Sequence, residues 1–187
     1  MKRLAIFASY NGSVLEPILE AIKAKKLPLE VALIISNNTN AAVLKKAQEY
    51  NIAHALINTQ TTKDPDSALF DILKKEAIDI VLLAGYMKKI PPSLTQNFFI
   101  LNSHPALLPS YGGKGMYGRH VHEAVIKNKE KESGITLHRV NEVYDEGAII
   151  LQKSCLVNED ESVESLEAKV KQLEKKAVIE ALELCLK

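Results

Sequence analysis

Residues 100–109 read Ile-Leu-Asn-Ser-His-Pro-Ala-Leu-Leu-Pro and join an apolar run to a polar end. The stretch begins as a buried strand, because residues 98–101 are apolar and uncharged. Alternation along an extended backbone puts Asn102 and His104 on the same face of that strand, and Pro105 then ends it. An amide donor beside a titratable ring at the C-terminal end of a strand is typical of a polar active site. The alternative interpretation is an ordinary strand end, whose polar side chains only form hydrogen bonds within the turn that follows.

The composition is that of an ordinary soluble globular protein. The 187 residues fit one domain, with 47% hydrophobic and 25% charged residues. The net charge of +1 does not indicate a nucleic-acid partner. The only cysteines, Cys155 and Cys185, do not suggest a disulfide framework, so we expect a reducing compartment. The N-terminal apolar run is too short for a signal peptide and no stretch reaches membrane-spanning length, so we expect a cytoplasmic protein without membrane association.

Apolar residues recur at strand spacing and at helix spacing in alternation, which predicts an α/β fold. We expect strands over residues 4–8, 29–35, 53–57, 78–83 and 98–101. We expect helices over residues 14–22, 41–50 and 119–127, and two further helices that begin at Pro65 and at Ser162. This alternation implies βαβ units in a mostly parallel sheet with helices on both faces. Residues 134–140 and 148–157 flank a short turn and predict a C-terminal antiparallel hairpin. We expect a single domain over residues 1–187.

The loop Ser9-Tyr10-Asn11-Gly12-Ser13 follows the first strand and opens the first helix. Ser13 with Glu16 has the form of a capping box. Free backbone N–H groups and the positive end of a helix dipole favour a phosphate at such a place. The loop lacks the glycine patterns of dinucleotide and ATP sites, so it is compatible with a small phosphorylated substrate. A plain turn capped by Ser13 is the alternative.

Three further features allow two interpretations each. Asp145 lies at the hairpin turn, where it is either an ordinary turn residue or a carboxylate that orients His104 and raises its pKa. His138 could face the core or the site. Residues 120 and 122 form His-x-His at a helix start, but side chains two apart on a helix diverge, so we expect no metal site.

Charged residues elsewhere are also ambiguous. Glu174 flanks the apolar stripe of the last helix, where a solvated charge is common. Lys88 and Lys89 precede Ile90-Pro91-Pro92 and serve either solubility or an anionic ligand.

Five segments in a fixed order resemble the phosphoribosylglycinamide formyltransferase family of folate-dependent enzymes. They are residues 9–13, 83–87, 101–109, 134–138 and 145–152. The resemblance covers nearly the whole chain and implies a Rossmann-like formyltransferase fold. The Asn-x-His-Pro segment with the distant Asp-x-Gly-x-Ile-x-x-Gln segment also resembles methionyl-tRNA formyltransferase and formyltetrahydrofolate hydrolase. Because the chain shows neither the C-terminal domain of the tRNA enzyme nor the regulatory domain of the hydrolase, we expect the first activity.

The resemblance implies a role for each matching position. Asn102, His104 and Asp145 would form the catalytic trio. The substrate would be bound by Asn11, Gly12, Ser13, Val14 and Glu174. The formyl donor would be bound by Met87, Lys88, Lys89, Ile90, Asn102, Val140 and Asp145. The chain departs from the family pattern at Tyr10 and Val14, where glycine and asparagine are common, and at Lys88, where arginine is usual.

The implied reaction moves a formyl group from 10-formyltetrahydrofolate to the amine of glycinamide ribonucleotide in de novo purine biosynthesis. The amine would attack directly, and Asn102, His104 and Asp145 would stabilise the tetrahedral intermediate. The implied partners are small molecules, without a metal or a nucleic acid, and the protein would be a monomer or homodimer. The alternatives are a 10-formyltetrahydrofolate hydrolase, a sugar-nucleotide formyltransferase, and a non-catalytic folate- or phosphate-binding module on the same fold.

Overall fold

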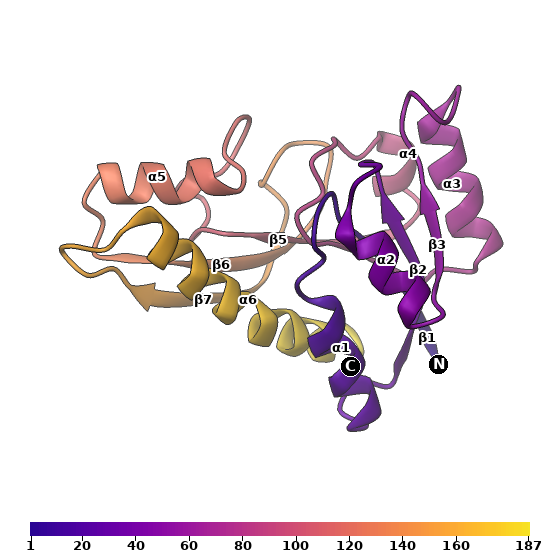
Figure 1. Ribbon diagram of the computed structural model, residues 1–187, viewed down its shortest axis with the longest axis horizontal. Helices are drawn as coiled ribbons and strands as arrows, with labels where there is room; N and C mark the ends of the chain where they lie inside the picture. The colour runs from indigo at the N-terminus through magenta and orange to yellow at the C-terminus, as the bar shows by residue number, and fades with distance from the viewer. The chain divides into compact units, whose positions relative to one another are not determined.

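A computed structural model describes residues 1–187, in which strands and helices alternate along most of the chain (Figure 1). The strands are β1 (Lys2–Phe7), β2 (Leu29–Ser36), β3 (Ala53–Leu56), β4 (Ile80–Leu83), β5 (Phe99–His104), β6 (Glu132–Arg139) and β7 (Ile149–Leu156). The helices are α1 (Leu15–Lys23), α2 (Ala42–Glu49), α3 (Pro65–Lys75), α4 (Pro92–Thr95), α5 (Arg119–Lys127) and α6 (Val163–Cys185). The predicted α/β class is therefore confirmed.

The seven strands form one sheet in the order β3-β2-β1-β4-β5-β6-β7. β1 pairs in parallel with β2 and with β4, and β2 pairs in parallel with β3. β6 and β7 pair antiparallel, so the predicted hairpin and the mixed character of the sheet are confirmed. By compactness the chain divides into two units, Met1–Leu101 and Asn102–Lys187, which are described in turn.

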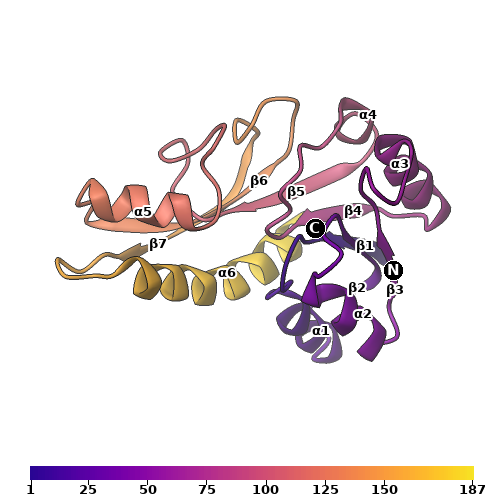
Figure 2. The same cartoon turned by 45° about the horizontal axis from the view of Figure 1, so that its top comes forward.

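The first unit contains β1 to β4. The side chains of β1, β2 and β4 are mostly buried, whereas those of the edge strand β3 are exposed or half-buried. Figure 2 shows α1 and α2 on one side of these strands and α3 and α4 on the other. Parallel strands covered on both faces have no solvent-facing side, which explains their nearly continuous apolar sequences. This arrangement leaves the loops after the strands to carry the polar groups of the unit.

The second unit consists of the β6–β7 hairpin with α5 and α6 beside it (Figure 1). The long helix α6 packs on both strands of the hairpin, and α5 packs on α6. The buried face of α6 is formed by Leu166, Val170, Ala177, Val178, Ala181 and Leu182. No helix of the chain is both long enough and apolar enough to cross a membrane.

Side chains cap two of the helices, whereas the predicted cap of α1 is wrong. The carboxylate of Asp64 accepts the N–H of Ser67, and the hydroxyl of Ser162 accepts the N–H of Ser165. Ser13, however, does not cap α1. Gly12, with a φ of +55°, turns the chain so that its carbonyl accepts the N–H of Leu15. The helix therefore starts one residue later than the capping box requires, with Val14 at the N-cap and no side-chain oxygen there.

Candidate active site

The end of β5 presents its side chains alternately to two faces, as predicted. Asn102 and His104 lie on one face, and Ser103 lies on the other. The strand continues through His104, so these two residues are held by the sheet rather than by the loop that follows it. The hydroxyl of Ser103 donates to Glu174 Oε1 of α6 at 2.6 Å. The predicted substrate contact Glu174 thus lies on the opposite face of β5 from Asn102 and His104.

The predicted trio comes together in the second unit around a fourth residue, His138 of β6. His104 Nδ1 lies 3.6 Å from Asp145 Oδ2. Asn102 Nδ2 lies 3.0 Å from His138 Nε2, which in turn lies 3.4 Å from Asp145 Oδ1. Both imidazole rings are buried, and the Asp145 side chain is only 11% exposed. The result is a small, largely dry cluster of one amide, two rings and one carboxylate.

The hydrogen bonds of His138 determine which way the Asn102 amide points. His138 Nδ1 lies 3.1 Å from the carbonyl of Arg139, which can only accept, so Nδ1 carries the proton of the neutral ring. His138 Nε2 is then an acceptor for one Asn102 N–H. The second N–H and the oxygen of the Asn102 amide have no partner and are available to a ligand. Sequence reasoning left the orientation of His138 open, and its alternation with Leu137 on β6 was the only signal.

The segment from Tyr111 to Gly113 contacts both His104 and Asp145. His104 Nε2 lies 2.8 Å from the carbonyl of Tyr111 and must therefore be protonated. The backbone N–H of Gly113 donates to Asp145 Oδ2 at 2.9 Å. This leaves His104 Nδ1 as the ring nitrogen that faces the carboxylate. The sequence analysis assigned no role to Tyr111 or Gly113.

The electrostatics of the cluster correct one expectation. Burial lowers the pKa of His104, and it outweighs the opposite effects of Asp145 and of the Tyr111 carbonyl. Asp145 therefore acts in the expected direction, but the net shift of the His104 pKa is downward. Burial acts to raise the pKa of Asp145, but the Gly113 N–H and the positive charges that His138 and His104 carry when they are protonated together lower it. At neutral pH the cluster thus holds a neutral His104 beside an ionised Asp145.

Glu174 has the opposite electrostatic character. Burial raises the pKa of this carboxyl group, while the hydrogen bond from Ser103 acts to lower it. Val140 follows β6 and is half-buried. Neither residue is hydrogen-bonded to the trio, and their assigned binding roles stay predictions.

In the first unit, the loop before α1 offers backbone rather than side-chain groups. The N–H groups of Gly12, Ser13 and Val14 have no hydrogen-bond partner in the structure. The Val14 side chain is fully buried, whereas Asn11 is exposed. A Cβ atom on Gly12 would lie 2.3 Å from Val43 Cγ2, so only glycine fits there. The loop has the features of an anion site at a helix N-terminus.

The loop after β4 carries the other predicted donor-binding residues. The backbone N–H of Met87 donates to Ser9 Oγ at 2.7 Å. Lys88 and Lys89 are exposed, whereas Ile90 is buried. These residues belong to the first unit, and their binding roles stay predictions.

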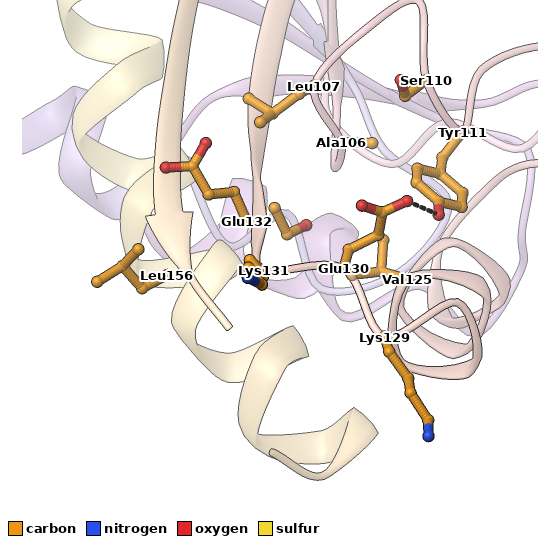
Figure 3. Close-up of a pocket in the computed structure, with 11 residues that line it drawn as sticks. Ala106, Leu107, Ser110, Tyr111, Val125, Lys129, Glu130, Lys131, Glu132 and Leu156 are labelled. Carbon is orange, nitrogen blue, oxygen red and sulfur yellow. Dashed lines mark hydrogen bonds between the residues drawn. The ribbon is translucent and has the colours of Figure 1, made fainter. Parts of the chain in front are cut away.

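A surface pocket of about 790 Å³ lies elsewhere in the second unit (Figure 3). Its walls include Ala106, Leu107, Val125 and the segment from Lys129 to Ser133, and it contains none of the trio. We place the chemistry at the His104 cluster rather than in this pocket, because only the cluster joins titratable groups to an amide donor. Tyr111 is shared by both places.

No three His, Cys, Asp or Glu side chains are arranged to hold a metal ion. His120 is exposed and His122 is buried, so the two side chains diverge. Cys155 and Cys185 are free thiols.

The chain is similar in sequence to two proteins named phosphoribosylglycinamide formyltransferase. The phosphoribosylglycinamide formyltransferase of Haemophilus influenzae is 37% identical over 179 residues, which cover 93% of this chain and 82% of that protein. The chloroplastic phosphoribosylglycinamide formyltransferase of Arabidopsis thaliana is 38% identical over 97% of this chain, which spans 64% of the plant protein.

Solved structures point the same way. The glycinamide ribonucleotide transformylase 1 of Geobacillus kaustophilus superposes with a TM-score of 0.91 at 32% identity, with 100% of both chains covered. The Bacillus halodurans phosphoribosylglycinamide formyltransferase gives a TM-score of 0.90 at 34% identity, covering 99% of this chain and 95% of that one. The family model described as formyl transferase matches residues 2–182. This chain therefore belongs to the formyl transferase family.

Proposed function

We propose that the protein transfers the formyl group of 10-formyltetrahydrofolate to the amine of glycinamide ribonucleotide, in the cytoplasm, as a step of purine biosynthesis. The observation that carries the proposal is the cluster of Asn102, His104 and Asp145 in a member of the formyl transferase family. The names of the similar proteins supply the acceptor, since both relatives and both structures described above act on glycinamide ribonucleotide by name.

The cluster suits direct attack of an amine on a formyl carbon. As the amine nitrogen bonds to that carbon, the formyl oxygen becomes an oxyanion, to which the unengaged N–H of Asn102 donates. The His104–Asp145 pair takes the proton that the amine loses, and His104 becomes an imidazolium stabilised by the carboxylate 3.6 Å away. The bond from the formyl carbon to N10 of the folate then breaks. The electron pair stays on N10, which receives the proton from His104.

The family resemblance assigns the residues that bind the two substrates. The unpaired N–H groups of Gly12, Ser13 and Val14 would hold the substrate phosphate, with the exposed Asn11 beside them. Glu174 would contact the glycinamide end. The resemblance also assigns Met87 to Ile90, Val140, Asn102 and Asp145 to the donor folate.

A spectrophotometric assay tests the proposal. Purified protein is mixed with 10-formyltetrahydrofolate, with and without glycinamide ribonucleotide, and loss of the formyl group is followed. Turnover only with the nucleotide supports the transferase. Turnover without it indicates a hydrolase, turnover with an amino sugar nucleotide indicates a different acceptor, and binding of folate without any turnover indicates a non-catalytic module.

The pH dependence of kcat is a second check. Neutral His104 accepts the proton in this mechanism, so activity should fall as the pH drops through the pKa of His104. Burial puts that pKa below the ordinary value of 6.5. The acidic limb of the kcat profile should therefore lie below about pH 6.5. A limb well above that value would contradict a neutral His104 as the base.

A further inference from the structure

The backbone and the side chain of Tyr111 bind different parts of the protein. Its carbonyl accepts the Nε2–H of His104 at 2.8 Å, which sets the orientation of the ring. Its φ is +57°, a conformation that residues with a Cβ atom rarely adopt. Such a conformation persists only where the surroundings hold it.

The hydroxyl group of Tyr111 is anchored at the turn that follows α5. It donates to Glu130 Oε1 at 2.6 Å and accepts from Asn128 Nδ2 at 2.8 Å. Figure 3 shows the Tyr111 ring pointing towards Glu130 across the wall of the pocket, with this bond dashed. A bond from a phenol to a carboxylate is stronger than a neutral one. The turn therefore holds the far end of a side chain whose backbone contacts the catalytic ring.

The two residues after Tyr111, Gly112 and Gly113, contact Asp145. A Cβ atom on Gly112 would lie 2.6 Å from Leu108 Cδ2 and 3.3 Å from Asp145 Cβ, so the segment lies tightly against the carboxylate residue. The N–H of Gly113 then donates to Asp145 Oδ2. A shift of Tyr111 would thus move both members of the His104–Asp145 pair.

We propose that Tyr111 is a positioning residue, whose hydroxyl group, held by Glu130 and Asn128, keeps its own carbonyl on His104 Nε2 and so keeps Nδ1 of that ring facing Asp145. The proposal rests on the proposed function, because it assigns His104 the proton transfer. The charged or titratable groups that act on His104 are Asp145 from the β6–β7 loop, His138 from β6 and His122 from α5. None of them bonds Nε2, and Asp145 faces Nδ1 instead, so the Tyr111 carbonyl is the group that favours a proton on Nε2.

The kinetic test compares Tyr111→Phe with Tyr117→Phe. Like Tyr111, Tyr117 lies in the loop between β5 and α5, and its exposed hydroxyl group has no hydrogen-bond partner, so it is a matched control. Tyr111→Phe should lower kcat about fivefold, the equivalent of one ordinary hydrogen bond, with both KM values within about twofold. Its acidic limb should move to lower pH, because the carbonyl contact that acts to raise the pKa of His104 is weakened. Tyr117→Phe should match wild type.

A double variant distinguishes anchoring from general destabilisation. Glu130→Gln removes the charged acceptor, so it should reproduce part of the Tyr111→Phe loss. The double variant should be no worse than Tyr111→Phe, because both changes break the same bond. Losses that multiply, or a Tyr111→Phe variant with wild-type kcat and pH profile, would overturn the proposal. Thermal unfolding of each variant identifies any that fail to fold.

A test that does not depend on activity uses nitrogen-15 NMR of the imidazole rings. The signals of His104 are those that are missing from the spectrum of His104→Gln. Wild-type protein and Tyr117→Phe should show a single Nε2–H tautomer for His104. Tyr111→Phe should show a mixture of tautomers. This arm needs no substrate, so it tests the positioning role even if the transferase assay is negative. An unchanged His104 tautomer in folded Tyr111→Phe would refute the role, and a mixture with no turnover by wild type would refute only the proposed reaction.

Discussion

The loop before α1 presents backbone groups to a ligand, whereas the cluster around His104 presents side-chain groups. The loop offers backbone N–H groups, and its one fully buried side chain, Val14, faces away from solvent. The cluster offers an amide, two imidazoles and a carboxylate held in contact by β5, β6 and the β6–β7 loop. Backbone donors exist whatever the side chain, so the loop should tolerate substitution wherever the turn is preserved. The cluster should not, because its chemistry belongs to the side chains.

The largest effect is expected for the side chains of the cluster. Asn102→Ala removes the oxyanion donor and His104→Ala removes the base, and each should lower kcat by about a hundredfold or more. His120→Ala, at an exposed histidine on α5, should retain wild-type kcat. Steady-state kinetics on variants of matched thermal stability makes the comparison. Near-wild-type turnover by both cluster variants would remove the catalytic assignment.

We expect nucleotide binding by the loop to be sensitive only to substitutions that change the backbone conformation. Gly12→Ala puts a methyl group 2.3 Å from Val43 Cγ2 at a φ of +55°, so the loop must move. Conformational strain of this kind costs about 1–3 kcal/mol, which we expect to appear as a KM for the nucleotide raised about tenfold. The KM for the folate should change little. A variant with an unchanged nucleotide KM would show that this loop does not bind the substrate.

An intermediate effect is expected for His138, which acts on the cluster through Asn102. His138→Ala removes the acceptor that orients the amide, so Asn102 can rotate. The loss of one buried hydrogen bond should lower kcat by about fivefold to tenfold without changing the nucleotide KM. His138→Gln, which can still accept from Asn102, should recover part of the loss. Equal kcat values for the two variants would mean that orientation of the amide is not the role of His138.

The smallest effect is expected for a side chain in the loop. Ser13 does not cap α1, and its backbone N–H remains in Ser13→Ala. We therefore expect the nucleotide KM to change by no more than about threefold, the scale of a weak exposed hydrogen bond. Isothermal titration with the nucleotide would check this independently of turnover. A tenfold loss would show that the loop works through side chains after all, and the contrast with the cluster would disappear.

Much of the fold could be predicted from the sequence because its signals are local. The α5 boundaries, the Asp64 cap of α3, the start of α6 next to Ser162 and the β6–β7 hairpin follow from spacing, capping residues and turn residues within a few positions. The failed Ser13 cap shows the limit of that approach. The sequence does match the capping-box pattern. However, Gly12 adopts a left-handed conformation beside Val43 of α2, and α1 therefore begins one residue later than that pattern requires.

By itself, the sequence determined that Asn102 and His104 share a face, since alternation along a strand needs no knowledge of the rest of the chain. It also supplied, through family resemblance, the third member, Asp145. Only the tertiary structure decided how these groups work together. His138 orients the amide, the carbonyl of Tyr111 selects the His104 tautomer, and burial outweighs Asp145 in setting the direction of the His104 pKa. These properties depend on distances between residues far apart in the chain and on the exclusion of water, which local patterns do not encode.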